Sequence, residues 1–91
     1  MENYLLKVDE GAGNNSFTTN HLITAKDRQM VKYHFHRTLK DGVYTDSQYD
    51  DNKHHLISKW SSTTAEIASI EKLTQTEANI LSKFINYWTK L

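Results

Sequence analysis

The segment Leu73-Thr74-Gln75-Thr76-Glu77-Ala78 has the pattern that begins a helix. At an N-cap, the Thr74 hydroxyl accepts a hydrogen bond from the Glu77 amide, and the Glu77 carboxylate reaches back to the Thr74 amide. Leu73 and Ala78 are placed to pack across this start. The segment predicts a helix from about residue 74 toward the C-terminus, whose apolar face is formed by Leu81, Phe84, Ile85, Trp88 and Leu91.

The residues before this helix fit two structures. Thr63-x-x-Glu66 is a second capping box, so one long helix over residues 63–90 fits the pattern. A strand over 65–72 followed by a separate helix fits as well. We favour strand then helix, because the cap at Thr74 would have no function inside a continuous helix.

Three other segments have the alternation of apolar and polar residues that is typical of strands. Residues 4–8 and 17–23 predict two strands with one buried side each. The segment 9–16 between them contains two glycines and two asparagines, and we expect it to turn the chain. A third strand is predicted at residues 54–60.

Residues 25–41 are the main ambiguity. Thr24-x-x-Asp27 resembles a capping box with Asp in place of Glu, and Gly42 suits the end of a helix. The alternative is a strand that ends in a hairpin turn at Asp41-Gly42. We favour the helix.

The resulting order is ββαββα, which predicts a small α+β domain covering residues 1–91. Its four-stranded antiparallel sheet is expected to be covered on one face by two helices. The chain has 91 residues, of which 37% are hydrophobic and 24% charged, and this is the size and composition of one globular domain. The core of such a domain is small, so a homodimer that buries further apolar surface is compatible with the sequence.

Composition argues against several classes of protein. No segment approaches the roughly 20 apolar residues that cross a membrane, and the N-terminus lacks a secretory leader pattern, so we expect a cytoplasmic protein. Cysteine is absent, which removes disulfides and thiolate zinc sites. Proline is also absent while Asn and Lys are plentiful, a usage that fits an AT-rich genome such as that of a phage or mobile element.

The predicted central helix has a basic face. It consists of Arg28, Lys32, His36 and Lys40, spaced by four and flanked by Tyr33 and Arg37. Like charges at this spacing disfavour the helix by a few tenths of a kcal/mol per pair. An acidic partner would explain the face, and an ordinary solvated face that Asp27 and Asp41 partly offset is the alternative. Formal net charge is zero, which argues against strong nonspecific binding to nucleic acid.

Two further features are candidate contacts. Asp46, Asp50 and Asp51 form an acidic segment that can mimic phosphate groups, although a solvated loop has the same composition. Trp60 lies near the end of a predicted strand, and tryptophan is enriched among the residues that contribute most to binding.

Catalytic and metal-binding patterns are not found. The five histidines are His21, His34, His36, His54 and His55. Adjacent histidines on a strand point to opposite faces, and two helical residues at spacing two lie about 200° apart, so neither close pair chelates a metal by itself. No nucleophile elbow, zinc-protease helix or phosphate-binding glycine loop appears. We expect neither an enzyme nor a cofactor.

The leading hypothesis is a small non-enzymatic binding protein, an accessory or inhibitor protein of a phage or mobile element that covers a surface of a protein partner. The alternative is a nucleic-acid-binding module, with Arg28, Lys32, Arg37 and Lys40 on phosphates and Tyr33 stacking on a base.

Overall fold

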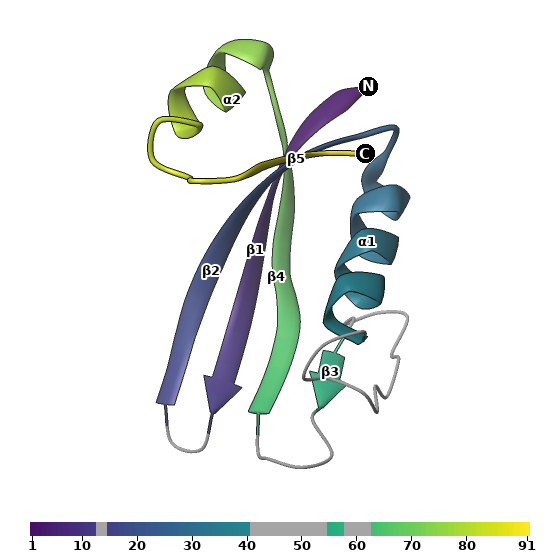
Figure 1. Ribbon diagram of the computed structural model, residues 1–91, viewed down its shortest axis with the longest axis vertical. Helices are drawn as coiled ribbons and strands as arrows, with labels where there is room; N and C mark the ends of the chain where they lie inside the picture. The colour runs from purple at the N-terminus through teal and green to yellow at the C-terminus, as the bar shows by residue number, and fades with distance from the viewer. Residues whose placement is uncertain (13–14, 41–54, 58–62) are drawn as a thin grey trace.

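The computed structural model describes residues 1–12, 15–40, 55–57 and 63–91. Its elements in chain order are β1 (Glu2–Ala12), β2 (Asn15–Ala25), α1 (Arg28–Lys40), β3 (His55–Ile57), β4 (Thr63–Leu73), α2 (Gln75–Leu81) and β5 (Trp88–Lys90). The strands form one sheet in the order β3-β4-β1-β2-β5 (Figure 1). β1 is antiparallel to β2 and to β4, β3 is antiparallel to β4, and β5 is parallel to β2.

The α+β class and both disputed segments agree with the favoured predictions. α1 confirms the helix within residues 25–41, and the hairpin alternative is wrong. β4 and α2 are separate elements, so the single long helix over 63–90 is also wrong. The predicted turn over 9–16 is mostly strand, because β1 and β2 stay paired up to Ala12 and Asn15.

The sheet is mixed and has a fifth strand, which corrects the predicted antiparallel four-stranded sheet and the order ββαββα. α2 ends at Leu81, and the amides of Lys83 and Phe84 donate to carbonyls three residues earlier, which tightens the last turn. The chain then turns back and pairs Trp88–Lys90 with β2. Phe84 is 80% exposed, so the apolar spacing after Leu81 does not mark one buried helix face.

The two helices lie on opposite faces of the sheet, not on one face as predicted. Side chains alternate along a strand, so each strand offers two sets of residues. The α1 core contains Tyr4, Leu6, Val8, Ile23, Ala25, Val31, Phe35, Ala65 and Ile70. The α2 core contains Leu5, Leu22, Leu73 and Ala78, with Leu81, Ile85 and Trp88 packed against it. β1 lies in the middle and contributes to both cores.

A β-bulge keeps β4 in register with the α1 core. Leu6 pairs with Ile70 and Val8 pairs with Ile67, so Ala68 is the extra residue on β4. Ile67 and Ile70 are separated by an odd number of positions and would point to opposite faces of a regular strand. The bulge at Ala68 brings both to the face that α1 covers.

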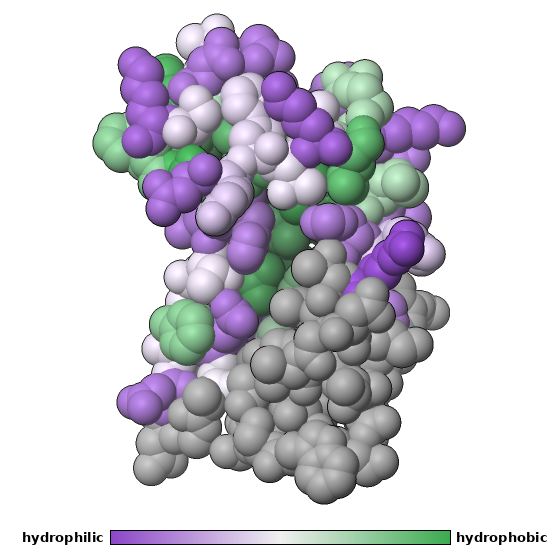
Figure 2. Space-filling view, viewed as in Figure 1, coloured by the Kyte–Doolittle hydropathy of each residue, from purple (hydrophilic) through white to green (hydrophobic). Residues whose placement is uncertain are grey.

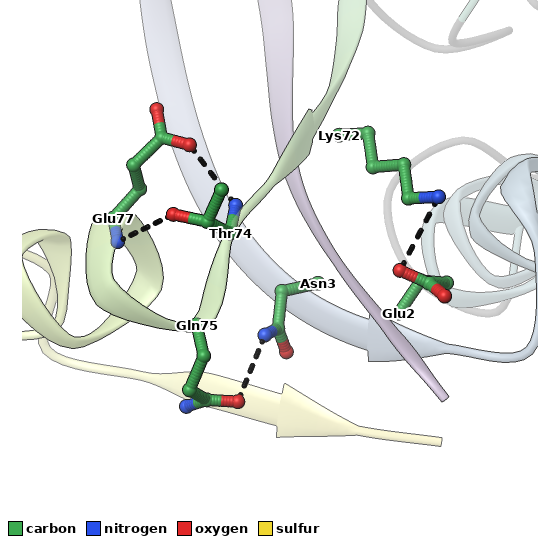
Figure 3. Close-up of polar contacts among 6 residues, drawn as sticks. All are labelled: Glu2, Asn3, Lys72, Thr74, Gln75 and Glu77. Atoms are coloured by element: carbon green, nitrogen blue, oxygen red, sulfur yellow. Dashed lines mark hydrogen bonds and ion pairs between the residues drawn. The ribbon is translucent and has the colours of Figure 1, made fainter.

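A network of polar side chains joins β1, β2, α2 and β5 beside the α2 core. The Thr24 hydroxyl donates to Asn3 Oδ1 at 2.7 Å and accepts from the indole N–H of Trp88 at 2.8 Å. Asn3 Nδ2 donates to Gln75 Oε1 at 3.2 Å (Figure 3). Thr24 therefore belongs to β2, and its predicted role in a capping box with Asp27 is wrong.

The capping box predicted at residue 74 is confirmed. The Glu77 amide donates to Thr74 Oγ1 at 3.1 Å, and the Thr74 amide donates to Glu77 Oε1 at 3.0 Å (Figure 3). Ala78 is fully buried behind this cap. These contacts fix where β4 ends and where α2 begins.

The bulge gives a test of the register. We expect deletion of Ala68 to leave the free energy of unfolding within about 1 kcal/mol, because Ile67 and Ile70 then face α1 in a regular strand. Deletion of Glu71 is the matched control, and it should cost about 2–5 kcal/mol, because Leu73 moves out of the α2 core. Urea unfolding of both variants measures the difference. Equal losses in both would contradict this register.

Candidate functional site

α1 is fixed in place by its cap and by one buried side. Asp27 Oδ1 accepts a hydrogen bond from the Met30 amide at 2.9 Å, so Asp27 is the N-cap and the helix begins three residues later than Thr24 implies. Val31 and Phe35 are buried in the α1 core. The opposite side of the helix therefore faces away from the sheet.

That opposite side combines apolar and basic residues. Met30 is 41% exposed and Tyr33, one turn further along the helix, is 59% exposed. Arg37, four residues after Tyr33, is also exposed. We call Met30, Tyr33 and Arg37 the outer face of α1. Beside this face lies a shallow hollow of about 520 Å³, lined by Lys26, Asp27, Gln29, Met30, Tyr33 and His36.

The predicted basic residues whose side chains the structure describes differ in exposure. Arg28 and Arg37 are exposed, whereas Lys32 and His36 are half-buried. A spacing of four drifts by about 40° per step around a helix of 3.6 residues per turn, so the series winds along one flank of α1. Lys40 is the last residue of α1. The structure brings His36 and Tyr33 together at the hollow.

Four predicted contact residues lie outside the described part of the chain. They are Asp46, Asp50, Asp51 and Trp60. The proposed roles of the acidic segment and of Trp60 therefore stay predictions.

A second site lies between α1 and β2, and the sequence did not indicate it. Glu10, His21 and His34 line a hollow of about 100 Å³. Thr19 lies beside it, hydrogen-bonded to Glu10 and His21. We call these four residues the histidine cleft. Its floor is formed by the α1 core, through Leu6, Val8, Ile23 and Phe35. Figure 2 shows hydrophobic side chains over the middle of the sheet, with hydrophilic side chains to their left.

Hydrogen bonds connect three residues of the histidine cleft. Thr19 Oγ1 donates to Glu10 Oε2 at 2.9 Å and lies 2.9 Å from His21 Nε2. The hydroxyl has one hydrogen, which goes to the carboxylate, so the neutral His21 ring donates its Nε2–H to Thr19. His21 Nδ1 is then left as a hydrogen-bond acceptor.

Both histidines of the cleft are biased toward the neutral form. Burial lowers the pKa of His21, the Glu10 carboxylate partly opposes this, and His34 adds to the lowering. Burial also lowers the pKa of His34, with a smaller contribution from Arg37. Desolvation disfavours the charged imidazolium, so both rings favour the neutral form near pH 7.

The cleft offers hydrogen-bond acceptors above an apolar floor, which suits a small polar group. Within the described residues, no group of three or more His, Asp or Glu side chains is arranged to hold a metal ion. His21 is exposed on the strand face that it shares with the buried Ile23, and His34 is half-buried on α1. No local sequence pattern marks either histidine as a site residue. Only the path of α1 across the sheet brings the two rings to one hollow.

No family model, curated protein or solved structure matches this chain. Among the described residues, no helix is long and apolar enough to cross a membrane.

The two cleft histidines predict a pH dependence of stability. Their pKa values are below 6.5 in the folded protein and near 6.5 in the unfolded chain, so the unfolded state binds more protons in that window. Stability should therefore fall as pH drops from about 7.5 to 5.5. We expect a smaller fall for the double variant His21→Gln, His34→Gln, measured by urea unfolding at both pH values.

Glu77→Gln is the control for this experiment. Hydrogen bonds from Thr74 lower the pKa of Glu77 from 4.5. The contribution of Glu77 to the free energy of unfolding therefore changes only below that pH. The variant should lose the same stability at both pH values. An unchanged pH response in the double histidine variant would contradict the assignment.

Proposed function

We propose that this protein is a small non-enzymatic binding protein that covers a surface of a protein partner with the outer face of α1. The observation that carries the proposal is the exposure of Met30 and Tyr33, one turn apart, beside a hollow. Arg37 continues the same face.

The residue types of this face suit a protein partner. Tyrosine, methionine and arginine are enriched in the centres of protein interfaces, where an apolar body is buried and a polar end finds a partner. Val31 and Phe35 hold the opposite side of α1 in the core. The face is therefore formed before binding, which lowers the ordering cost of association.

An accessory or inhibitor role in a phage or mobile element is part of the same proposal. Its support is compositional: the chain has no proline and many Asn and Lys residues, as AT-rich genomes encode. Occluding a partner needs a rigid surface and no reacting group, and the outer face of α1 supplies such a surface.

The test compares two exposed apolar side chains on different helices. Tyr33→Ala should weaken capture of a protein partner from host lysate at least about tenfold, as loss of a central aromatic residue does. Ile80→Ala is the control, because Ile80 is 51% exposed on α2, which lies on the opposite face of the sheet from α1. Quantitative mass spectrometry identifies the partner, and calorimetry with the purified partner measures the affinity. Equal affinity of both variants would contradict the proposal.

Nucleic acid is the competing partner, and the variant Arg28→Glu distinguishes it. Fluorescence anisotropy with duplex DNA, single-stranded DNA and RNA at about 50 and 200 mM salt detects phosphate contacts by a steep loss of affinity. Binding that is salt-sensitive and lost in Arg28→Glu would favour the nucleic-acid module over the protein-binding function.

A further inference from the structure

Among the strands that the structure describes, none covers the outer edge of β2 over most of its length. We call this unpaired part the open edge. β1 pairs with the inner edge of β2 from Asn15 to Ala25. On the outer edge, β5 pairs only with Leu22–Thr24. Among the described strands, none pairs with this edge over residues 15–21, and Figure 1 shows this part of β2 at the border of the sheet.

One hydrogen bond shows which backbone groups this edge presents. The Leu91 amide donates to the Thr24 carbonyl at 2.8 Å, so the backbone of Thr24 points outward, toward β5. The pairing of β1 with β2 runs without a register shift, and successive residues alternate between inward and outward backbone groups. The outward N–H and C=O groups of the open edge therefore belong to Ser16, Thr18 and Asn20.

The open edge lacks the features by which proteins block strand pairing. Edge strands are usually protected by charged side chains, proline or a bulge. The 11 residues of β2 include no Lys, Arg, Asp, Glu or proline, and its ladder with β1 has no bulge. The interior strands carry the charges, for example Lys7 on β1 and Glu71 on β4, which form an ion pair at 3.7 Å.

We infer that two copies of this chain pair through their open β2 edges, antiparallel, around a twofold axis at Thr18. Thr18 then lies opposite Thr18 of the second copy, Phe17 opposite Thr19, and Ser16 opposite Asn20. The three pairs formed by the outward residues exchange about six backbone hydrogen bonds. The result is one continuous sheet through both copies.

The sequence of the edge is complementary to itself in this register. A twofold interface brings the same patch of both copies together, so a charge at the edge would meet its own copy. The register produces no such pair, because residues 15–21 are uncharged at neutral pH apart from the titratable His21. Phe17 is 53% exposed, and it gains a β-branched neighbour in Thr19 of the second copy.

A hollow beside the edge, with both polar and apolar side chains, extends the same interface. It has a volume of about 380 Å³, lies where the open edge meets β5, and is lined in part by Asn20, Leu22, Phe84 and Tyr87. Tyr87 is 82% exposed there. In the twofold register, Ser16 of the second copy lies opposite Asn20, so the start of its β2 lies beside this hollow.

The dimer goes beyond the proposed function and leaves its surface free. Antiparallel strands of one sheet are related by an axis perpendicular to the sheet, so both copies turn the same face to the same side. α1 covers that face in each copy. The two outer faces of α1 therefore point the same way, and a partner with two binding sites can meet both.

The test uses the residue on the axis. Sedimentation velocity at about 1–200 µM protein should show a concentration-dependent dimer for the parent chain. Thr18→Lys should weaken dimerisation at least about tenfold, because two lysines meet at the axis. Within one copy the new lysine lies beside Asp9, whose carboxylate accepts from Thr18 at 2.8 Å, so the fold should be retained.

Two comparisons make the outcome specific. Ala68→Lys adds the same charge to an exposed position on β4 and should dimerise as the parent does. Thr18→Glu alone should be monomeric, and an equimolar mixture of Thr18→Glu and Thr18→Lys should restore the dimer. A parent chain that stays monomeric over the whole range, or a Thr18→Lys variant that dimerises like Ala68→Lys, would overturn the inference. Failure of the dimer would leave the Tyr33 experiment unaffected.

Discussion

β1 supplies apolar side chains to both faces of the sheet, and the burial of both sets is the constraint on which the layers depend. Tyr4, Leu6 and Val8 are covered by α1, while Leu5 is covered by α2. A strand that is apolar on one side needs one covering layer, and a strand that is apolar on both sides needs two. The opposite placement of the helices follows from this.

The α2 core is small, and hydrogen bonds between polar side chains beside it add to the packing of that face. Asn3, Thr24, Gln75 and Trp88 form a connected hydrogen-bond network between four elements. A buried amide such as that of Asn3 is costly without partners, so the network favours the one arrangement that satisfies it. That arrangement brings β5 beside β2 over three residues, and no other described strand pairs with the rest of this β2 edge.

The two proposed contact surfaces lie on different elements and make different demands. The outer face of α1 offers side chains on a helix that is already anchored, which suits recognition of a particular protein. The β2 edge offers backbone groups, whose pairing needs a complementary strand more than particular side chains. Pairing through the β2 edges would place two outer faces of α1 on the same side of the dimer. Two linked contacts can bind far more tightly than one. The histidine cleft lies between them, with Thr19 shared between the cleft and the edge.

Local patterns in the sequence determined most of the elements. Alternation predicted β1 and β2, and the cap at Thr74 predicted α2 as an element separate from β4, because these signals depend only on neighbouring residues. The helical interpretation of residues 25–41 was right, but its cap was misassigned. Thr24 has a partner, Trp88, that lies 64 positions away.

The tertiary structure alone decided the features that join distant segments. The apolar spacing after Leu81 fits a helix, yet the chain turns because Trp88 packs on the α2 core and its indole reaches Thr24. His21 and His34 line one hollow because of the way α1 crosses the sheet, and no local pattern encodes that crossing. The sequence alone shows that residues 15–25 contain no Lys, Arg, Asp or Glu. That β2 is an edge strand, and that its free backbone groups belong to Ser16, Thr18 and Asn20, follows only from the strand order and the register, because strand neighbours are set by contacts across the whole domain.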